Sequence, residues 1–265
     1  MIQKFKYPLL SNAFSENDIS CGLKVLSSKY ITMSKITKNF EKQFAKKLGC
    51  KYALMTNSGS SANLLAVSAI INPMFKNKLR AGDEVLIPAV CWSTSLWPII
   101  QNNLKPVFVD VELDTFNISI KDLRKKITSK TKAIMCVHVL GTSTNLNHIK
   151  KLINKKNIIL IEDTCESLGA KFNNKFLGTF GEFGTFSFYY SHQITSGEGG
   201  MIVCNNVKNY NIIKSLRSHG WSRETTFHNI YKKKFKKLDD RFLFINSGYN
   251  LRPTDIQAAI AYNQF

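Results

Sequence analysis

The feature that most constrains the fold is an alternation of short apolar runs with longer segments of helical spacing. Seven runs have the length of a strand: YALMT (52–56), EVLIPA (84–89), PVFVDV (106–111), KAIMCVHVL (132–140), IILIEDT (158–164), FGTFSFYY (183–190) and GGMIVCN (199–205). Between them lie SGSSANLLAVSAIINPMF, TSLWPIIQNN and HIKKLINKK, whose apolar residues recur at helical spacing. This order predicts an α/β fold with a mostly parallel sheet flanked by helices.

Length and composition are consistent with one large domain. The chain has 265 residues, of which 44% are hydrophobic, enough to bury one sizeable core. It contains no stretch of about 18 consecutive apolar residues, so no membrane span is expected. The opening residues, MIQKFKYPLL, hold no apolar signal-peptide run, and we expect a cytoplasmic protein.

Cysteine spacing argues against a disulfide framework or a metal site. The six cysteines are scattered and form no CxxC pair. We expect most of them to be small buried residues.

The formal net charge of +19 raises nucleic-acid binding as an alternative. Lysine is spread along the whole chain, however, and the dense run KKKFKK (232–237) is typical of a solvated face or loop. No motif that reads DNA or RNA accompanies the charge. A basic surface also suits a substrate that carries a diphosphate, so we expect no nucleic-acid partner.

A polar turn from Asn57 to Ala62 separates an expected strand from an expected helix. Gly59 lets the backbone turn tightly, and hydroxyls beside the free amides of a helix N-terminus suit a phosphate. An ordinary helix-capping turn has the same composition, so this motif alone leaves both interpretations open.

Three more polar segments follow apolar ones. Asp163 ends a strand-like run, where an acid can pair with a buried cation such as a protonated pyridine nitrogen, or cap a following helix. His192 lies between a strand and a Gly-rich turn, a usual place for loop chemistry, although a lone histidine is more often structural. The turn NSGYNLR (246–252) precedes a last helix that Thr254 is expected to cap.

Taken together, in this order and at these separations, the segments resemble the DegT/DnrJ/EryC1/StrS family of sugar aminotransferases, which are fold-type I pyridoxal phosphate enzymes. The resemblance covers nearly the whole chain and includes AGDEVLIPA, PVFVDVELDTFNI, GEFGTFSFY and GYNLRPTDIQAAI. It implies the cofactor-binding large domain over residues 1–240 and the start of a C-terminal region over 241–265. Because the last helical pattern stops abruptly, we expect a truncated chain in which the family's small C-terminal domain is largely missing.

The resemblance also implies a cofactor, pyridoxal 5'-phosphate or pyridoxamine 5'-phosphate. Asp163 would pair with its pyridine nitrogen, and Trp92 would stack on its ring. The phosphate ligands implied by the resemblance are Gly59, Ser60, Ser187 and, from the neighbouring subunit, Asn250. A homodimer with shared active sites follows from that last ligand.

The chain departs from the usual family pattern at His192, where most members carry the lysine that bonds to the cofactor. Histidine has no primary amine for that bond, but it can act as an acid or a base near neutral pH. His192, Glu166 and the VHVLGT stretch (137–142) resemble the branch of nucleotide-sugar 3-dehydratases. We therefore expect His192 and Glu166 to be the catalytic residues.

That branch has a type that uses an iron–sulfur cluster and a type that does not. Cys165 matches the first cluster cysteine, but the segment after SHGWSRE (218–224) contains no further cysteine. A single cysteine cannot hold a cluster that needs several protein ligands. The resemblance thus favours the cluster-free type, which acts on GDP-4-keto-6-deoxymannose.

The hypothesis from the sequence is removal of the C3 hydroxyl from a nucleotide-linked 4-keto-6-deoxy sugar, with glutamate as the amino donor. Such a reaction belongs to deoxysugar and lipopolysaccharide O-antigen biosynthesis. Two alternatives stay open beside it. One is a nucleotide-sugar aminotransferase with an altered lysine, and the other is an inactive truncated homologue that acts as a binding subunit.

Overall fold

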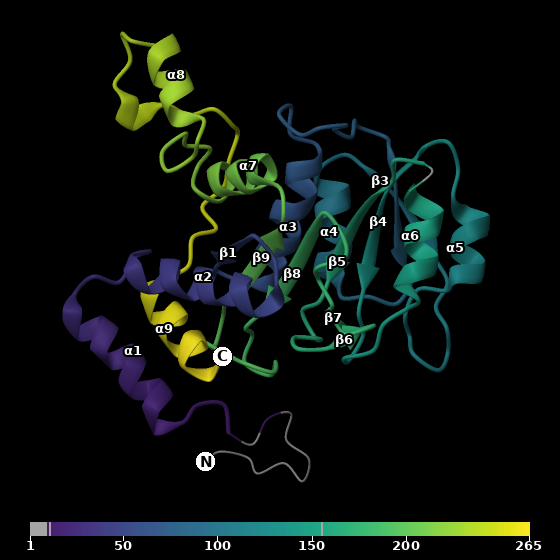
Figure 1. The fold of residues 1–265 in the computed structure, drawn as a ribbon, viewed down its shortest axis with the longest axis horizontal. Coiled ribbons are helices and arrows are strands. Elements are labelled where there is room, and N and C mark those ends of the chain that lie inside the picture. The colour runs from purple at the N-terminus through teal and green to yellow at the C-terminus, as the bar shows by residue number, and fades with distance from the viewer. Residues whose placement is uncertain (1–9, 11, 155) are drawn as a thin grey trace.

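The computed structural model describes residues 10, 12–154 and 156–265 (Figure 1). The strands are β1 (Tyr52–Thr56), β2 (Glu84–Pro88), β3 (Lys105–Val109), β4 (Thr131–Val137), β5 (Ile159–Asp163), β6 (Lys171–Phe172), β7 (Lys175–Phe176), β8 (Phe183–Ser187) and β9 (Gly200–Cys204). The α-helices are α1 (Glu16–Ser28), α2 (Lys35–Leu48), α3 (Gly59–Ile70), α4 (Ser93–Gln101), α5 (Ile120–Lys126), α6 (Leu146–Asn154), α7 (Val207–Arg217), α8 (His228–Lys234) and α9 (Asp255–Gln264), and a 3₁₀ turn, η1, spans Asp240–Phe242.

Seven strands form one sheet in the order β1-β9-β8-β5-β4-β2-β3, and β6 pairs with β7 in a separate hairpin. Strands β3, β2, β4, β5 and β8 run parallel, whereas β9 is antiparallel to both β8 and β1. All seven expected strands belong to this sheet, and the prediction of a mostly parallel sheet flanked by helices is confirmed. Because β5 and β8 are parallel neighbours, Asp163 and Ser187 end their strands at the same edge.

Both faces of the sheet are covered, which explains why its strands are continuous apolar runs. Every residue of β2 is buried. Val85 and Ile87 pack into the core under α3, α4 and α7, while Leu86 points into a second core with residues of α5 and α6. The alternation along β2 follows from the two-residue period of a strand.

Helix α2, which the strand pattern did not predict, covers the sheet over β1, β9 and β8. Phe40 and Phe44 of α2 are fully buried and form an aromatic cluster with Phe186, Phe188 and Phe265. Helices α1 and α9 lie side by side below α2 (Figure 1). The expected last helix is confirmed as α9, and Thr254 caps it in a capping box with Gln257.

Helix α8 projects from the body of the molecule beyond α7 (Figure 1) and has no buried residue. The basic run 232–237 begins in this helix and is exposed almost throughout, as the sequence predicted. The proposed boundary between the large domain and a C-terminal region, at residues 240/241, stays a prediction.

The cysteines are less buried than expected. Cys136 and Cys204 are buried, but Cys21, Cys50, Cys91 and Cys165 are partly accessible, so the expectation that most are buried is wrong. Cys136 and Cys204 lie in the buried strands β4 and β9, whereas Cys21 lies in α1 and the other three lie in connecting segments. Within the described residues, no helix is long and apolar enough to cross a membrane, and no group of three potential ligands is placed to hold a metal ion.

Candidate functional site

The residues predicted to bind a cofactor come together where β5 and β8 end beside the first turns of α3 and α4. Ser60 of α3 donates a hydrogen bond from its hydroxyl to Thr94 Oγ1 of α4 over 3.0 Å. This contact links the two helix N-termini. The site therefore lies beyond the carboxyl ends of parallel strands, the usual place for a ligand in an open α/β sheet.

Gly59 forms a tight cradle at the start of α3. A Cβ atom on this residue would lie 2.5 Å from Ser187 Cβ and 2.9 Å from Cys165 Sγ, so no other residue fits without a shift. The Ser187 hydroxyl is thus brought beside the free amides of the helix N-terminus, an arrangement that suits a phosphate. Ser58 also caps α3 by accepting from Ser61 N at 3.0 Å, so the turn is both a helix cap and a potential anion site.

Asp163 is a buried carboxylate, 5% exposed, held by donors from three segments. Its Oδ2 accepts from Asn63 Nδ2 of α3 at 2.8 Å and from Ser95 Oγ of α4 at 2.7 Å. Its Oδ1 accepts from Cys165 N at 3.1 Å. The next element after Asp163 is β6, so the alternative that it caps a following helix is not observed. A buried, oriented negative charge suits a cationic partner such as a pyridinium.

Two thiols lie close to this charge. Burial, and after it the charge of Asp163, raises the pKa of Cys91 to about 11. The same two causes raise the pKa of Cys165 well above its usual value. Both side chains are therefore neutral thiols at neutral pH rather than nucleophilic thiolates.

His192 lies in the loop between β8 and β9. Its backbone N–H donates to the Tyr189 carbonyl at 3.0 Å, and the two rings meet edge to face with centroids 5.7 Å apart. Its ring atom Nδ1 is buried and has no hydrogen-bond partner among the described residues. A buried ring nitrogen without a partner is costly unless a ligand group or a proton acceptor meets it.

Glu166 lies next to the same loop, because Gln193 Nε2 donates to its backbone carbonyl at 2.7 Å. The carboxylate of Glu166 is exposed. The structure thus brings Glu166 and the histidine loop together, while the catalytic role of Glu166 stays a prediction.

Trp92 is the N-cap residue of α4, and 73% of its surface is exposed. Its ring is free to receive a stacked partner beside the first turn of that helix. Asn250 is also exposed and accepts from Arg252 Nε at 3.0 Å. The Leu251 carbonyl accepts from Asn57 N at 3.1 Å, so this segment borders the turn before α3 in its own subunit. A role for Asn250 in a neighbouring subunit stays a prediction.

A buried pair on the other face of β5, Glu162 and His138, was not predicted from the sequence. Glu162 and Asp163 are consecutive strand residues and so point to opposite faces. Glu162 Oε2 lies 3.0 Å from His138 Nε2 and accepts from Gly178 N at 2.9 Å. Its Oε1 accepts from Phe180 N at 2.6 Å and from Gly181 N at 2.7 Å. Two acids in succession at a strand end were the available signal for this cluster.

The arrangement fits pyridoxal phosphate by several separate observations. The Gly59 cradle matches a phosphate, the buried Asp163 carboxylate matches a protonated ring nitrogen, and the exposed Trp92 matches an aromatic ring. The unpartnered His192 nitrogen adds a group that can hold or move a proton.

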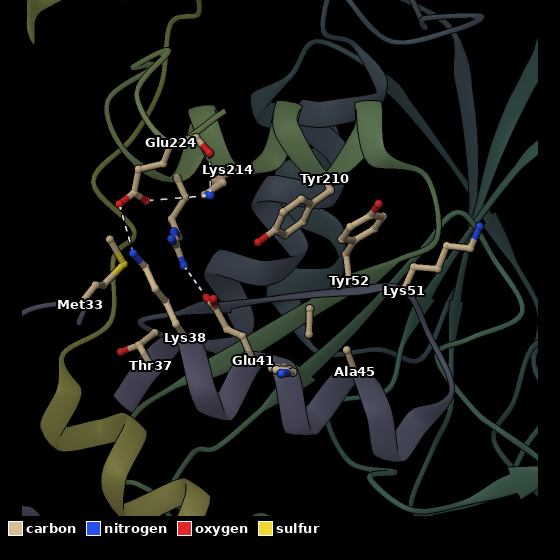
Figure 2. Close-up of a pocket in the computed structure, with 13 residues that line it drawn as sticks. Met33, Thr37, Lys38, Glu41, Ala45, Lys51, Tyr52, Tyr210, Lys214 and Glu224 are labelled. Atoms are coloured by element: carbon tan, nitrogen blue, oxygen red, sulfur yellow. Dashed lines mark hydrogen bonds and ion pairs between the residues drawn. The ribbon is translucent and has the colours of Figure 1, made fainter. Parts of the chain in front are cut away.

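A separate cavity of about 410 Å³ lies between α2 and α7 (Figure 2) and contains none of the predicted site residues. Arg217 beside it donates from Nη1 to Glu41 Oε1 at 2.9 Å and to the Met55 carbonyl at 2.7 Å. Glu41 Oε1 in turn accepts from Met55 N at 2.8 Å. These contacts attach the edge strand β1 to α2 and α7, which is a structural role.

Comparison with known proteins identifies the family of this chain. The model of the DegT/DnrJ/EryC1/StrS aminotransferase family matches residues 13–265. GDP-4-keto-6-deoxy-D-mannose 3-dehydratase of Escherichia coli O55:H7 (strain CB9615 / EPEC) is 44% identical over 260 residues, which are 97% of this chain and 67% of that protein.

Solved structures of GDP-4-keto-6-deoxymannose-3-dehydratase have the same fold. A histidine-to-asparagine variant with bound GDP-perosamine gives a TM-score of 0.91 at 43% identity. A form with a trapped PLP–glutamate geminal diamine gives 0.89 at 41% identity. Each comparison covers 98% of this chain and 67% of the other, so the chain spans about two thirds of the length of these relatives. Because the family model matches nearly the whole length of this chain, the chain belongs to the DegT/DnrJ/EryC1/StrS aminotransferase family.

Proposed function

We propose that this protein is a 3-dehydratase of a nucleotide-linked 4-keto-6-deoxy sugar and depends on pyridoxal or pyridoxamine 5'-phosphate. The observation that carries the proposal is His192, whose Nδ1 is buried and has no hydrogen-bond partner among the described residues, in the loop that follows Ser187. The resemblance places a lysine at this position in most family members. A histidine there removes the covalent anchor and leaves a group suited to proton transfer.

Four parts of the chain would bind the cofactor. The N-terminus of α3 at Gly59 and Ser60, with the Ser187 hydroxyl, would bind its phosphate. Trp92 would cover one face of its ring, and Asp163 would accept from its ring nitrogen. When bound, the cofactor supplies an amino group that can join a keto carbon and a ring that withdraws electrons from it.

His192 would move the protons. Imidazole changes charge near neutral pH, so one ring can first accept a proton and later return it. We propose that a ring nitrogen of His192 delivers a proton to the C3 hydroxyl of the sugar, so that the hydroxyl leaves as water. Glu166, which borders the histidine loop, is the second proposed catalytic residue.

The proposed substrate is a GDP-linked sugar, and the proposed amino donor is glutamate. A solved relative holds GDP-perosamine, and another holds an adduct of PLP with glutamate, which supports both proposals. The formal net charge of +19 suits a substrate with a diphosphate. Asn250 as a phosphate ligand from a neighbouring subunit would require a homodimer with shared active sites. Biosynthesis of lipopolysaccharide deoxysugars is the pathway that this substrate implies.

The test is to incubate the purified chain with pyridoxal phosphate, glutamate and GDP-4-keto-6-deoxymannose and to measure ammonia and sugar products. We expect one ammonia and one 2-oxoglutarate for each 3-deoxy-4-keto sugar, and no turnover with His192→Asn. A 4-amino sugar without ammonia would replace the proposal with aminotransfer. Binding of cofactor and substrate without either product would identify an inactive binding subunit.

A further inference from the structure

Asn63 lies one turn inside α3 and connects a strand hydroxyl to the Asp163 carboxylate. Thr185 Oγ1, on β8, donates to Asn63 Oδ1 at 2.6 Å, and Asn63 Nδ2 donates to Asp163 Oδ2 at 2.8 Å. Asn63 is 1% exposed and Thr185 is fully buried. Water therefore does not compete for either hydrogen bond.

The side-chain amide of Asn63 has one favourable orientation. An asparagine side chain has an oxygen that accepts and a nitrogen that donates, at similar distances from its Cβ. The Asp163 carboxylate only accepts, so the nitrogen must point toward Asp163, and the oxygen then accepts from the Thr185 hydroxyl. The reversed amide would set its oxygen against a buried carboxylate, which is unfavourable in a low-dielectric interior. Asp163 thus fixes which end of Asn63 meets it, and Thr185, whose hydroxyl also lies 3.3 Å from the Glu162 carbonyl, holds the other end of the amide in place.

Ser95 completes the arrangement from the other helix. Its hydroxyl donates to the same Oδ2 atom at 2.7 Å, and the side chain is fully buried. Two donors from two helices therefore hold Oδ2, while Cys165 N holds Oδ1 from the chain beyond β5. Together they restrict rotation of the carboxylate about its Cβ–Cγ bond.

We propose that Asn63, held in place by Thr185, is a positioning residue that sets the direction in which Asp163 faces the pyridine nitrogen of the cofactor. The inference rests on the cofactor of the proposed function, but not on whether dehydration or aminotransfer follows. A carboxylate fixed before binding loses little freedom when the cofactor arrives, so its hydrogen bond to the ring is stronger.

The test uses two variants that keep the volume of the side chain. Thr185→Val removes the hydroxyl, and Asn63→Leu removes the amide. We expect each to raise the Kd for pyridoxal phosphate roughly tenfold, the usual cost of one hydrogen bond to a charged group. We also expect the pH midpoint of the bound cofactor's absorption change to fall, because the protonated ring nitrogen has a less well-placed partner. The matched control is Thr225→Val, which removes a buried threonine hydroxyl that donates to the Ser222 carbonyl. It should change neither the Kd nor the pH midpoint.

The decisive measurement repeats Thr185→Val and Asn63→Leu in an Asp163→Ala background. A positioning role predicts no further change in Kd there, since both act through the missing carboxylate. An equal rise in Kd with and without Asp163, or no change in Kd in either background, would overturn the inference and leave the proposed function intact. If the unsubstituted chain takes up no pyridoxal phosphate, the proposed function and the inference both fail.

Discussion

His138 Nε2 lies 3.0 Å from Glu162 Oε2, and neither side chain is exposed to solvent. The His138 backbone N–H also donates to the Asp163 carbonyl at 2.9 Å. The pair is therefore attached to the strand end that carries Asp163. It lies on the face of β5 opposite to the Asp163 side chain and does not line the candidate site.

We expect Glu162→Gln to destabilise the fold by about 1–3 kcal/mol, because its new NH₂ group would face backbone N–H donors and leave them without an acceptor. Chemical denaturation measures this free energy of unfolding. Glu166→Gln, on an exposed side chain, should stay within about 0.5 kcal/mol of the unsubstituted chain. Equal stability of the two variants would show that the Glu162 contacts contribute little.

Gly59→Ala should disrupt the phosphate cradle, because its Cβ would lie 2.5 Å from Ser187 Cβ. We expect a loss of roughly 1–3 kcal/mol in stability from overpacking. Affinity for pyridoxal phosphate, measured by fluorescence titration, should fall at least about tenfold. Gly82→Ala is the control, since that position has φ +85° but open space around it. Gly82→Ala should lower stability without changing the affinity for the cofactor. An unchanged affinity in Gly59→Ala would exclude the cradle as the phosphate site.

His192→Lys should restore a primary amine where the resemblance places one. We expect a covalent bond between that lysine and the cofactor aldehyde, seen as a new absorption band and made permanent by borohydride reduction. Mass spectrometry of the reduced protein would locate the added mass. Gln193→Lys puts an amine one residue further along the same loop and should not form the bond. Modification of both variants to the same extent would argue against a special position for His192.

Cys91 should react slowly with alkylating agents at neutral pH, because burial and the charge of Asp163 raise its pKa to about 11. Only the thiolate reacts, and its fraction rises about tenfold per pH unit below the pKa. Peptide mapping after iodoacetamide treatment should show this rise continuing beyond pH 9, the ordinary thiol value. A rate that levels off near pH 9 would show that Cys91 has an ordinary pKa.

The sequence predicted the sheet well because strands buried on both faces leave continuous apolar runs. It did not predict α2, although Phe40 and Phe44 stand at helical spacing, because the partners that bury them are as distant as Phe265. Local periodicity gives an element, but only the tertiary structure shows what covers it.

The same limit applies to the site. The family resemblance grouped Asp163, Ser187 and Gly59, and the structure places Gly59 against Ser187 and ends the strands of Ser187 and Asp163 at the same edge. Asn63 gave no signal, since a polar residue inside an apolar helix pattern has no meaning until its neighbours are known. Its function depends on Thr185, which is 122 residues away in the chain.

The two ends of the loop that carries His192 are held together by backbone pairing. Ser187 pairs with Gly200, and Phe188 N donates to the Gly199 carbonyl at 2.8 Å. The residue at 192 can therefore be exchanged without disturbing the register of either strand. Under the proposed function, the same separation accommodates an imidazole in place of an anchoring amine, so that one scaffold could serve to remove oxygen rather than add nitrogen with no change to its sheet.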